Sequence, residues 1–221
     1  MGFFSSLWEG VKSLASKAVS VVTNSVKKVG EVIVEGAKKF LEIEIEKLEV
    51  VKDILETIAK ALGIIKPEEN VEELGDKAMK AEKKPEEFDS VNQYIDYLRT
   101  QIHSSKKELE KLAPEEKLAR VSIGSALLSK AIEEKKSLEI PVEFWKEAVR
   151  LGLNSKEIDE YLNKFKEAGV KPEEFLKYLK RELNINDEEK VESALINAYK
   201  ELEPNLDIKD IEEKVISLPG K

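Results

Sequence analysis

Residues 4–40 read FSSLWEGVKSLASKAVSVVTNSVKKVGEVIVEGAKKF and carry an unbroken apolar pattern. The apolar residues recur every three or four positions, which matches one turn of an α-helix and not the two-residue period of a strand. The line consists of Phe4, Trp8, Val11, Ala15, Ala18, Val22, Val26, Val29, Ile33, Ala37 and Phe40. The stretch therefore predicts amphipathic helix.

The same stretch is basic, with six lysines and three glutamates, although the whole chain has a net charge of −8. Such a helix needs an apolar surface beside it, either a membrane interface or the faces of other helices. The predicted apolar-surface-binding residues are Phe3, Phe4, Trp8, Val11, Val22, Val26, Val29, Ile33 and Phe40. The lysines that would contact an anionic surface are Lys12, Lys17, Lys27 and Lys28.

The helical spacing continues from Leu41 to Ile65, so residues 1–64 are predicted to form long amphipathic helices. Gly30 and Gly36 are the expected places for a break, because glycine is unfavourable inside a helix. Residues 41–46 alternate as a strand would, but their helical neighbours favour helix. Gly63 and Pro67 are expected to end the tract.

Residues 65–89 are rich in Glu and Lys and are predicted to form a charged, acidic linker with a short solvated helix. Residues 90–221 are predicted to form a compact multi-helix bundle domain. Its first two helices are expected over 91–112 and from Pro114 onward, paired as a hairpin. Gly124 with its small neighbours leaves a strip that another helix could approach closely.

Five shorter helices are predicted after Pro141, over residues 142–151, 155–168, 172–183, 187–202 and 208–218. Several helix starts share a Pro-Glu-Glu pattern, which places acids against the positive helix end. The pattern has no fixed period, so the sequence does not predict a repeat protein. The predicted fold class is all-α.

Composition limits the function classes. The charged fraction is 37%, with many Lys and Glu, two Gln and no Cys. This is the pattern of hyperthermophiles, although an AT-rich genome that favours Lys codons is the alternative. The acidic total makes nucleic acid an unexpected partner. No apolar run is long enough to span a membrane and no signal peptide is evident, which favours a cytoplasmic or peripheral membrane location.

The sequence contains no recognisable catalytic or metal-binding motif. His103 is the single histidine, and one imidazole without cysteine does not make a zinc site. Adjacent acids such as Glu133 and Glu134 point about 100° apart on a helix, which does not aim both at one substrate. We therefore expect no enzymatic activity, no cofactor, no metal and no small-molecule substrate.

One spacing has a functional interpretation. Ala148, Gly152 and Ile158 are spaced as in a helix-turn-helix unit, with Leu153 in the turn. The helix that would read DNA begins with acids, including Glu157, which phosphate would repel. A plain helical corner is therefore favoured over a DNA reader. Trp145 is interpreted as a packing residue.

The sequence thus predicts a non-enzymatic accessory protein whose N-terminal region binds a membrane or another apolar surface, with a helical body for protein partners. Two alternatives remain open. One is a structural or assembly subunit, a homo-oligomer formed through the N-terminal helices. The other is a helix-turn-helix DNA-binding accessory protein.

Overall fold

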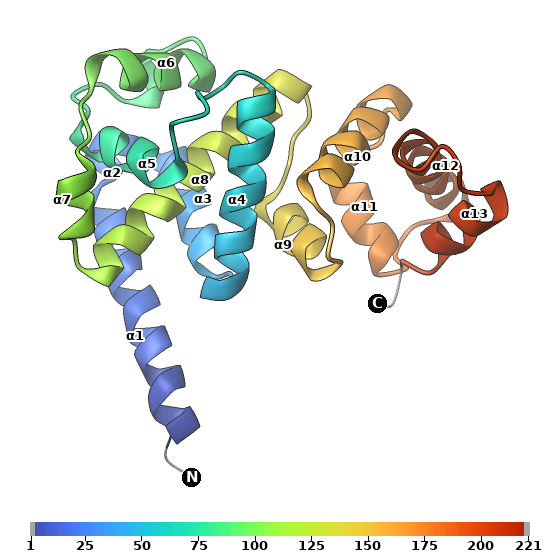
Figure 1. Cartoon of the computed structure of the whole chain (residues 1–221), viewed down its shortest axis with the longest axis horizontal. Helices are drawn as coiled ribbons and strands as arrows, with labels where there is room; N and C mark the ends of the chain where they lie inside the picture. Colours follow the sequence, from blue (N-terminus) through green and yellow to red (C-terminus); the bar gives the residue numbers. More distant parts are fainter. Residues whose placement is uncertain (1–2, 219–221) are drawn as a thin grey trace. The chain divides into compact units, whose positions relative to one another are not determined.

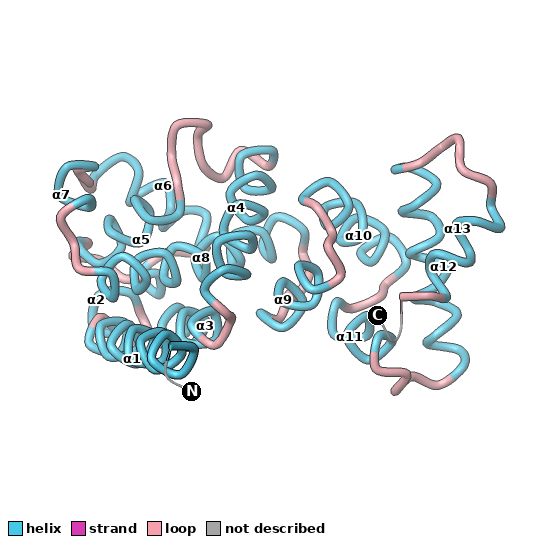
Figure 2. The backbone as a smooth tube through the Cα atoms, turned by 60° about the horizontal axis from the view of Figure 1, so that its bottom comes forward, coloured by secondary structure: helices cyan, strands magenta, loops and turns pink. Residues whose placement is uncertain are grey.

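The computed structural model describes the backbone of residues 3–218 and the side chains of residues 12–218 (Figure 1). Over that range the chain forms thirteen α-helices, one short 3-10 helix and no strand (Figure 2). The prediction of an all-α fold is confirmed. The chain divides into two compact units, and the division falls between Ile132 and Glu133.

Unit 1 contains the first seven α-helices, the 3-10 helix and most of the eighth α-helix. They are α1 (Phe3–Asn24), α2 (Val26–Val29), α3 (Glu31–Leu41), α4 (Ile45–Ala61), α5 (Val71–Lys80), η1 (Pro85–Glu87), α6 (Val91–Gln101), α7 (Lys106–Glu110) and α8 (Pro114–Lys136). Unit 2 contains the end of α8 and the helices after it. These are α9 (Val142–Arg150), α10 (Ser155–Ala168), α11 (Pro172–Leu179), α12 (Ile185–Leu202) and α13 (Ile208–Ile216).

The N-terminal helical tract breaks at Gly30, as predicted, where a φ of 78° is easily adopted only by glycine. Gly36 instead lies inside α3. Further breaks lie at Ser25, between α1 and α2, and at residues 42–44, which form neither the favoured helix nor a strand. The single helix predicted over 91–112 is also wrong, because an extended segment at residues 102–105 separates α6 from α7.

Helix α8 runs through the middle of unit 1 (Figures 1 and 2). Every residue from Val121 to Ser129 is buried, so this part of the helix is covered on all sides. A helix that is buried all round needs apolar or small residues on every face rather than on one stripe. Three of its buried positions are Ser122, Gly124 and Ser125, which keep the helix thin.

Helices α5 and α8 cross with their backbones in direct contact. A Cβ atom added at Gly75 would lie 2.0 Å from the carbonyl oxygen of Arg120, and one added at Gly124 would lie 2.0 Å from that of Val71. Each helix therefore offers a glycine to the backbone of the other. The close approach predicted at Gly124 is confirmed, and its partner is α5.

This crossing corrects the predicted domain organisation. Residues 65–89 do not form a solvated linker, because Val71, Leu74 and Ala78 of α5 are buried in unit 1. Pro85 of η1 is buried as well. The division between compact units falls inside α8 and not at residues 65–89.

Unit 2 contains two helix pairs with matching parts. In each pair a short helix that follows or begins with proline leads to a residue in the left-handed region, Gly152 (φ 74°) or Arg181 (φ 59°). An asparagine, Asn154 or Asn184, then caps the second helix.

The equivalent helices of the two pairs lie against each other, α9 against α11 and α10 against α12. The rings of Phe144 and Phe175, at matching positions of α9 and α11, meet edge to face with centroids 5.8 Å apart. Unit 2 is therefore two helix pairs stacked in tandem, followed by α13 against α12. The match is a structural repeat that the sequence period does not reveal.

We predict that Gly124→Ala destabilises the protein by about 2–3 kcal/mol, because the new methyl group would meet a backbone carbonyl that cannot move aside. Gly36→Ala is the matched control, since its Cβ would meet only the Ala126 methyl group at 3.2 Å. We expect a change within about 1 kcal/mol there, because alanine is the better helix former. Urea denaturation measures both. Equal effects would contradict the backbone contact.

An ion pair beside the crossing ties the same two helices together. The carboxylate of Asp76, which is 2% exposed, accepts hydrogen bonds from Lys80 Nζ at 2.8 Å and Arg120 Nε at 2.9 Å. The Ser104 hydroxyl donates to it at 2.8 Å. Burial alone would raise the pKa of Asp76, but the hydrogen bonds from Lys80, Arg120 and Ser104 outweigh burial and hold the pKa below its ordinary value.

The lowered pKa has a definite consequence for stability. Below about pH 4 the unfolded chain binds a proton at Asp76 before the folded chain does, so the free energy of unfolding should fall as the pH decreases through that range. Asp76→Asn should cost about 2–4 kcal/mol at pH 7 and flatten this dependence. The control is Asp53→Asn at a side chain that is 73% exposed, where we expect about 0.5 kcal/mol or less. Denaturation at several pH values tests this, and an unchanged acid profile in Asp76→Asn would refute the assignment.

Candidate functional site

Among its described side chains, helix α1 contributes to the core of unit 1 with residues of its second half. Ala18 and Val22 are fully buried, Leu14 and Ala15 are half-buried, and Lys12 is exposed. The backbone is helical from Phe3 onward, so the first half of α1 extends beyond the other helices of unit 1 (Figure 1). We call residues 3–17 the α1 tip. In the sequence, the apolar line continues through the tip, N-terminal to the buried Ala18.

The structure places four of the nine predicted apolar-surface-binding residues in the core of unit 1. Val22, Val29 and Phe40 have no exposed area, Ile33 is 1% exposed, and Val26 is half-buried. In this fold these side chains pack inside unit 1. Periodicity indicated that this stripe needs a cover but did not indicate that the chain supplies it.

The remaining predicted residues lie toward the start of the chain. The side chains of Phe3, Phe4, Trp8 and Val11 fall outside the described residues, and only their helical backbone is placed. Among the predicted cationic contacts, Lys12 and Lys17 are exposed on the α1 tip, and Lys27 and Lys28 are exposed on α2. The four lysines therefore form two groups, and only Lys12 and Lys17 belong to the α1 tip.

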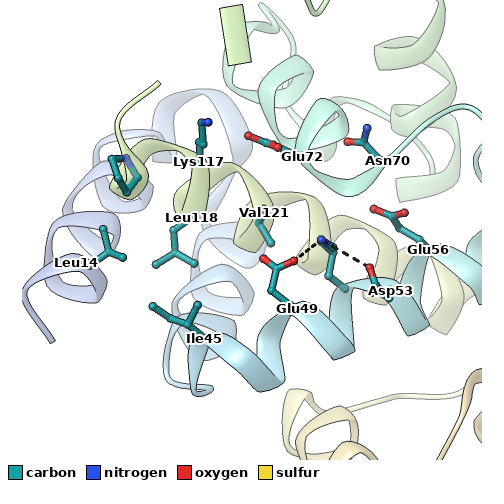
Figure 3. Close-up of a pocket in the computed structure, with 12 residues that line it drawn as sticks. Leu14, Ile45, Glu49, Asp53, Glu56, Asn70, Glu72, Lys117, Leu118 and Val121 are labelled. Carbon is teal, nitrogen blue, oxygen red and sulfur yellow. Dashed lines mark hydrogen bonds and ion pairs between the residues drawn. The ribbon is translucent and has the colours of Figure 1, made fainter. Parts of the chain in front are cut away.

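A groove of about 540 Å³ begins beside the α1 tip and runs along α4, α5 and α8 (Figure 3). Its apolar end is formed by residues from α1, α4 and α8. The residue from α1 is Leu14, which belongs to the tip. The apolar lining residues are Leu14, Ile45, Pro114, Leu118 and Val121. This end of the groove therefore begins on α1, at the residue next to Ala15 of the apolar line.

The other end of the groove is charged. Its polar lining residues are Glu49, Lys52, Asp53, Glu56, Asn70, Glu72 and Lys117. Lys52 forms ion pairs with Glu49 and, at 3.6 Å, with Asp53, as the dashed lines in Figure 3 mark. Glu56 accepts the backbone N–H of Val71 at 2.8 Å. Four carboxylates against two ammonium groups leave this end acidic.

Glu72 differs from the other acids of the groove. Its Oε1 atom is buried and has no hydrogen-bond partner. Burial raises the pKa of the Glu72 carboxyl above its ordinary value, and the nearby Lys117 and Lys52 offset this only in part. A buried, ionised carboxylate oxygen without a hydrogen-bond donor is unfavourable. An N–H or O–H group that donated to this oxygen would therefore stabilise the charged form of Glu72.

The single histidine and the acidic side chains lie as follows in the described part of the chain. His103 is an exposed residue in the segment between α6 and α7. Among the residues with described positions, no three or more His, Cys, Asp or Glu side chains are grouped to hold a metal ion. None of the described helices combines the length and hydropathy required to cross a membrane.

The helix-turn-helix spacing corresponds to a real corner between α9 and α10. Ala148 and Ile158 are fully buried, Leu153 is 7% exposed, and Gly152 has a φ of 74°. Helix α10 begins with a capping box in which Asn154 and Glu157 bond each other's backbone N–H groups. Glu157 is thus used within the helix start, and the acids beside it remain unfavourable toward phosphate. Trp145 is 1% exposed and is a core residue, as expected.

Comparison with protein-family models, characterised proteins and solved structures finds no match to this chain. The functional inference therefore rests on the residues, burial and charges of the α1 tip and of the groove beside it.

We predict that Glu72→Gln stabilises the dilute protein at pH 7. Because the pKa of Glu72 is raised on folding, the folded state is penalised once the pH rises above the ordinary value of the carboxyl, and glutamine removes that penalty. The gain should disappear near pH 3, where the carboxyl is protonated in both states. Urea denaturation at the two pH values measures it. A loss of stability at pH 7 would show that the charged carboxylate is already satisfied.

Proposed function

We propose that this chain is a non-enzymatic accessory protein that is anchored by the α1 tip to an apolar surface, foremost the interface of an anionic membrane. The rest of the helical chain would bind a protein partner. One observation supports this above the others: the helical backbone of α1 continues N-terminal to the buried Ala18 and Val22, beyond the other helices of unit 1 (Figure 1), and the sequence keeps its apolar spacing there. An apolar helix face that its own domain does not cover requires another cover.

The chemistry of the α1 tip suits a membrane interface. Phe3, Phe4 and Trp8 are large side chains near the start of the helix, where they can enter the boundary between headgroups and acyl chains. Each buried Å² of apolar surface contributes about 25 cal/mol. Lys12 and Lys17 are exposed on the same helix, and each lysine near an anionic surface adds about 1 kcal/mol.

This proposal predicts that the intact protein floats with vesicles that contain anionic lipid and that Phe4→Ser/Trp8→Ser abolishes flotation. The matched control is Val32→Ser/Val50→Ser, which removes two exposed valines, 55% and 47% exposed, from α3 and α4. We expect the control to bind as the unaltered protein does. Binding should weaken at high salt, because the lysine contribution is screened.

Equal flotation of the two double variants would refute the role of the tip, since binding would then depend on general apolar exposure. Flotation that is insensitive to both salt and anionic lipid would leave the aromatic anchor in place and remove the lysines from the proposal.

A further inference from the structure

The groove beside the α1 tip has properties that match the tip of another copy. Its apolar end includes Leu14, so the surface that would receive an apolar helix begins on the same helix that presents one. A surface patch that contains both a donor element and an acceptor groove is suited to a two-fold interface, in which each copy gives and receives the same contact.

Charge favours the same occupant. The charged end of the groove carries Glu49, Asp53, Glu56 and Glu72 against two lysines, whereas the α1 tip carries Lys12 and Lys17 against Glu9. An acidic groove and a basic amphipathic helix attract each other and fix the register of docking. Groups of opposite charge therefore meet while the apolar residues meet each other.

The unpaired oxygen of Glu72 is an independent reason for an occupant. This buried Oε1 atom lacks a donor, and a lysine ammonium or the indole N–H of Trp8 could supply one. Both groups occur in the tip. A groove wall that is incomplete within one chain would thus be completed by the chain's own first helix in a second copy.

We propose that two copies of this chain form a two-fold dimer in which the α1 tip of each lies in the groove of the other. The two α1 helices run antiparallel, with the axis near Leu14, so that each tip turns back over the partner's groove. The inference rests on the proposed function in one respect, the availability of the tip. It adds a second binding site for the α1 tip. That site is the groove of another copy, which the tip would occupy when it is not at a membrane.

The direct test is complementation between two variants of the full chain. Phe4→Glu/Trp8→Glu spoils the tip and leaves the groove, whereas Ile45→Lys spoils the apolar end of the groove and leaves the tip. Ile45 is half-buried, so Glu49→Lys, at a side chain that is 52% exposed, serves as a second groove variant. Circular dichroism and thermal unfolding establish that each variant is folded.

Sedimentation equilibrium should give a dimer for the unaltered protein and monomers for each variant alone, with dissociation constants weakened at least tenfold. An equimolar mixture of the tip variant and a groove variant should recover a one-to-one dimer, because one intact tip then meets one intact groove. That recovered dimer should be weaker than the unaltered one, since it retains one of two contacts.

Three results would overturn the inference. They are a monomeric unaltered protein at ~100 µM, groove variants that still dimerise through tip-to-tip contact, and a mixture that fails to associate. Vesicle flotation of the groove variants separates this inference from the proposed function. Groove variants that float but do not dimerise support both, whereas floating with a failed mixture rejects the dimer and retains the anchor.

Discussion

The fold of unit 1 depends on the close backbone contact between α5 and α8. Gly75 and Gly124 allow each helix to touch a carbonyl of the other, and the buried ion pair of Asp76 with Arg120 lies beside this contact. Because α8 is buried on every side from Val121 to Ser129, this part of the helix positions the helices packed around it. The start of α8 forms one wall of the groove, and α4 forms another.

The sequence predicted the helices better than it predicted how they pack. The helices predicted from residues 155 and 208 begin at those residues in the structure, and the break at Gly30 followed from glycine. The turn at residues 42–44 was missed because the apolar spacing runs through it without a change. The central position of α8 was missed because a helix buried all round has no apolar stripe to detect. Residues 65–89 were predicted to be solvated because Glu and Lys outnumber the few apolar residues there, of which the structure buries Val71, Leu74 and Ala78.

The candidate site shows the same limit of sequence reasoning. Periodicity indicated that the stripe from Phe4 to Phe40 needs a cover, but a stripe does not say what covers each part. Unit 1 itself covers the part from Ala18 onward, including Val22 and Phe40. The groove could not be predicted, because its residues come from four helices far apart in the sequence, and Glu72 is unremarkable among so many glutamates.

We propose that α1 is divided near Ala18. Its C-terminal part packs in unit 1, and its tip binds an external apolar surface. Hydrogen–deuterium exchange of amides along α1, in dilute protein with and without anionic vesicles, tests this division most directly. The account predicts rapid exchange over residues 3–17 that slows when vesicles are added, and slow exchange over residues 18–24 in both conditions. Slow exchange of the tip in dilute, lipid-free protein, unchanged by vesicles, would contradict it, because the chain would then cover its own tip.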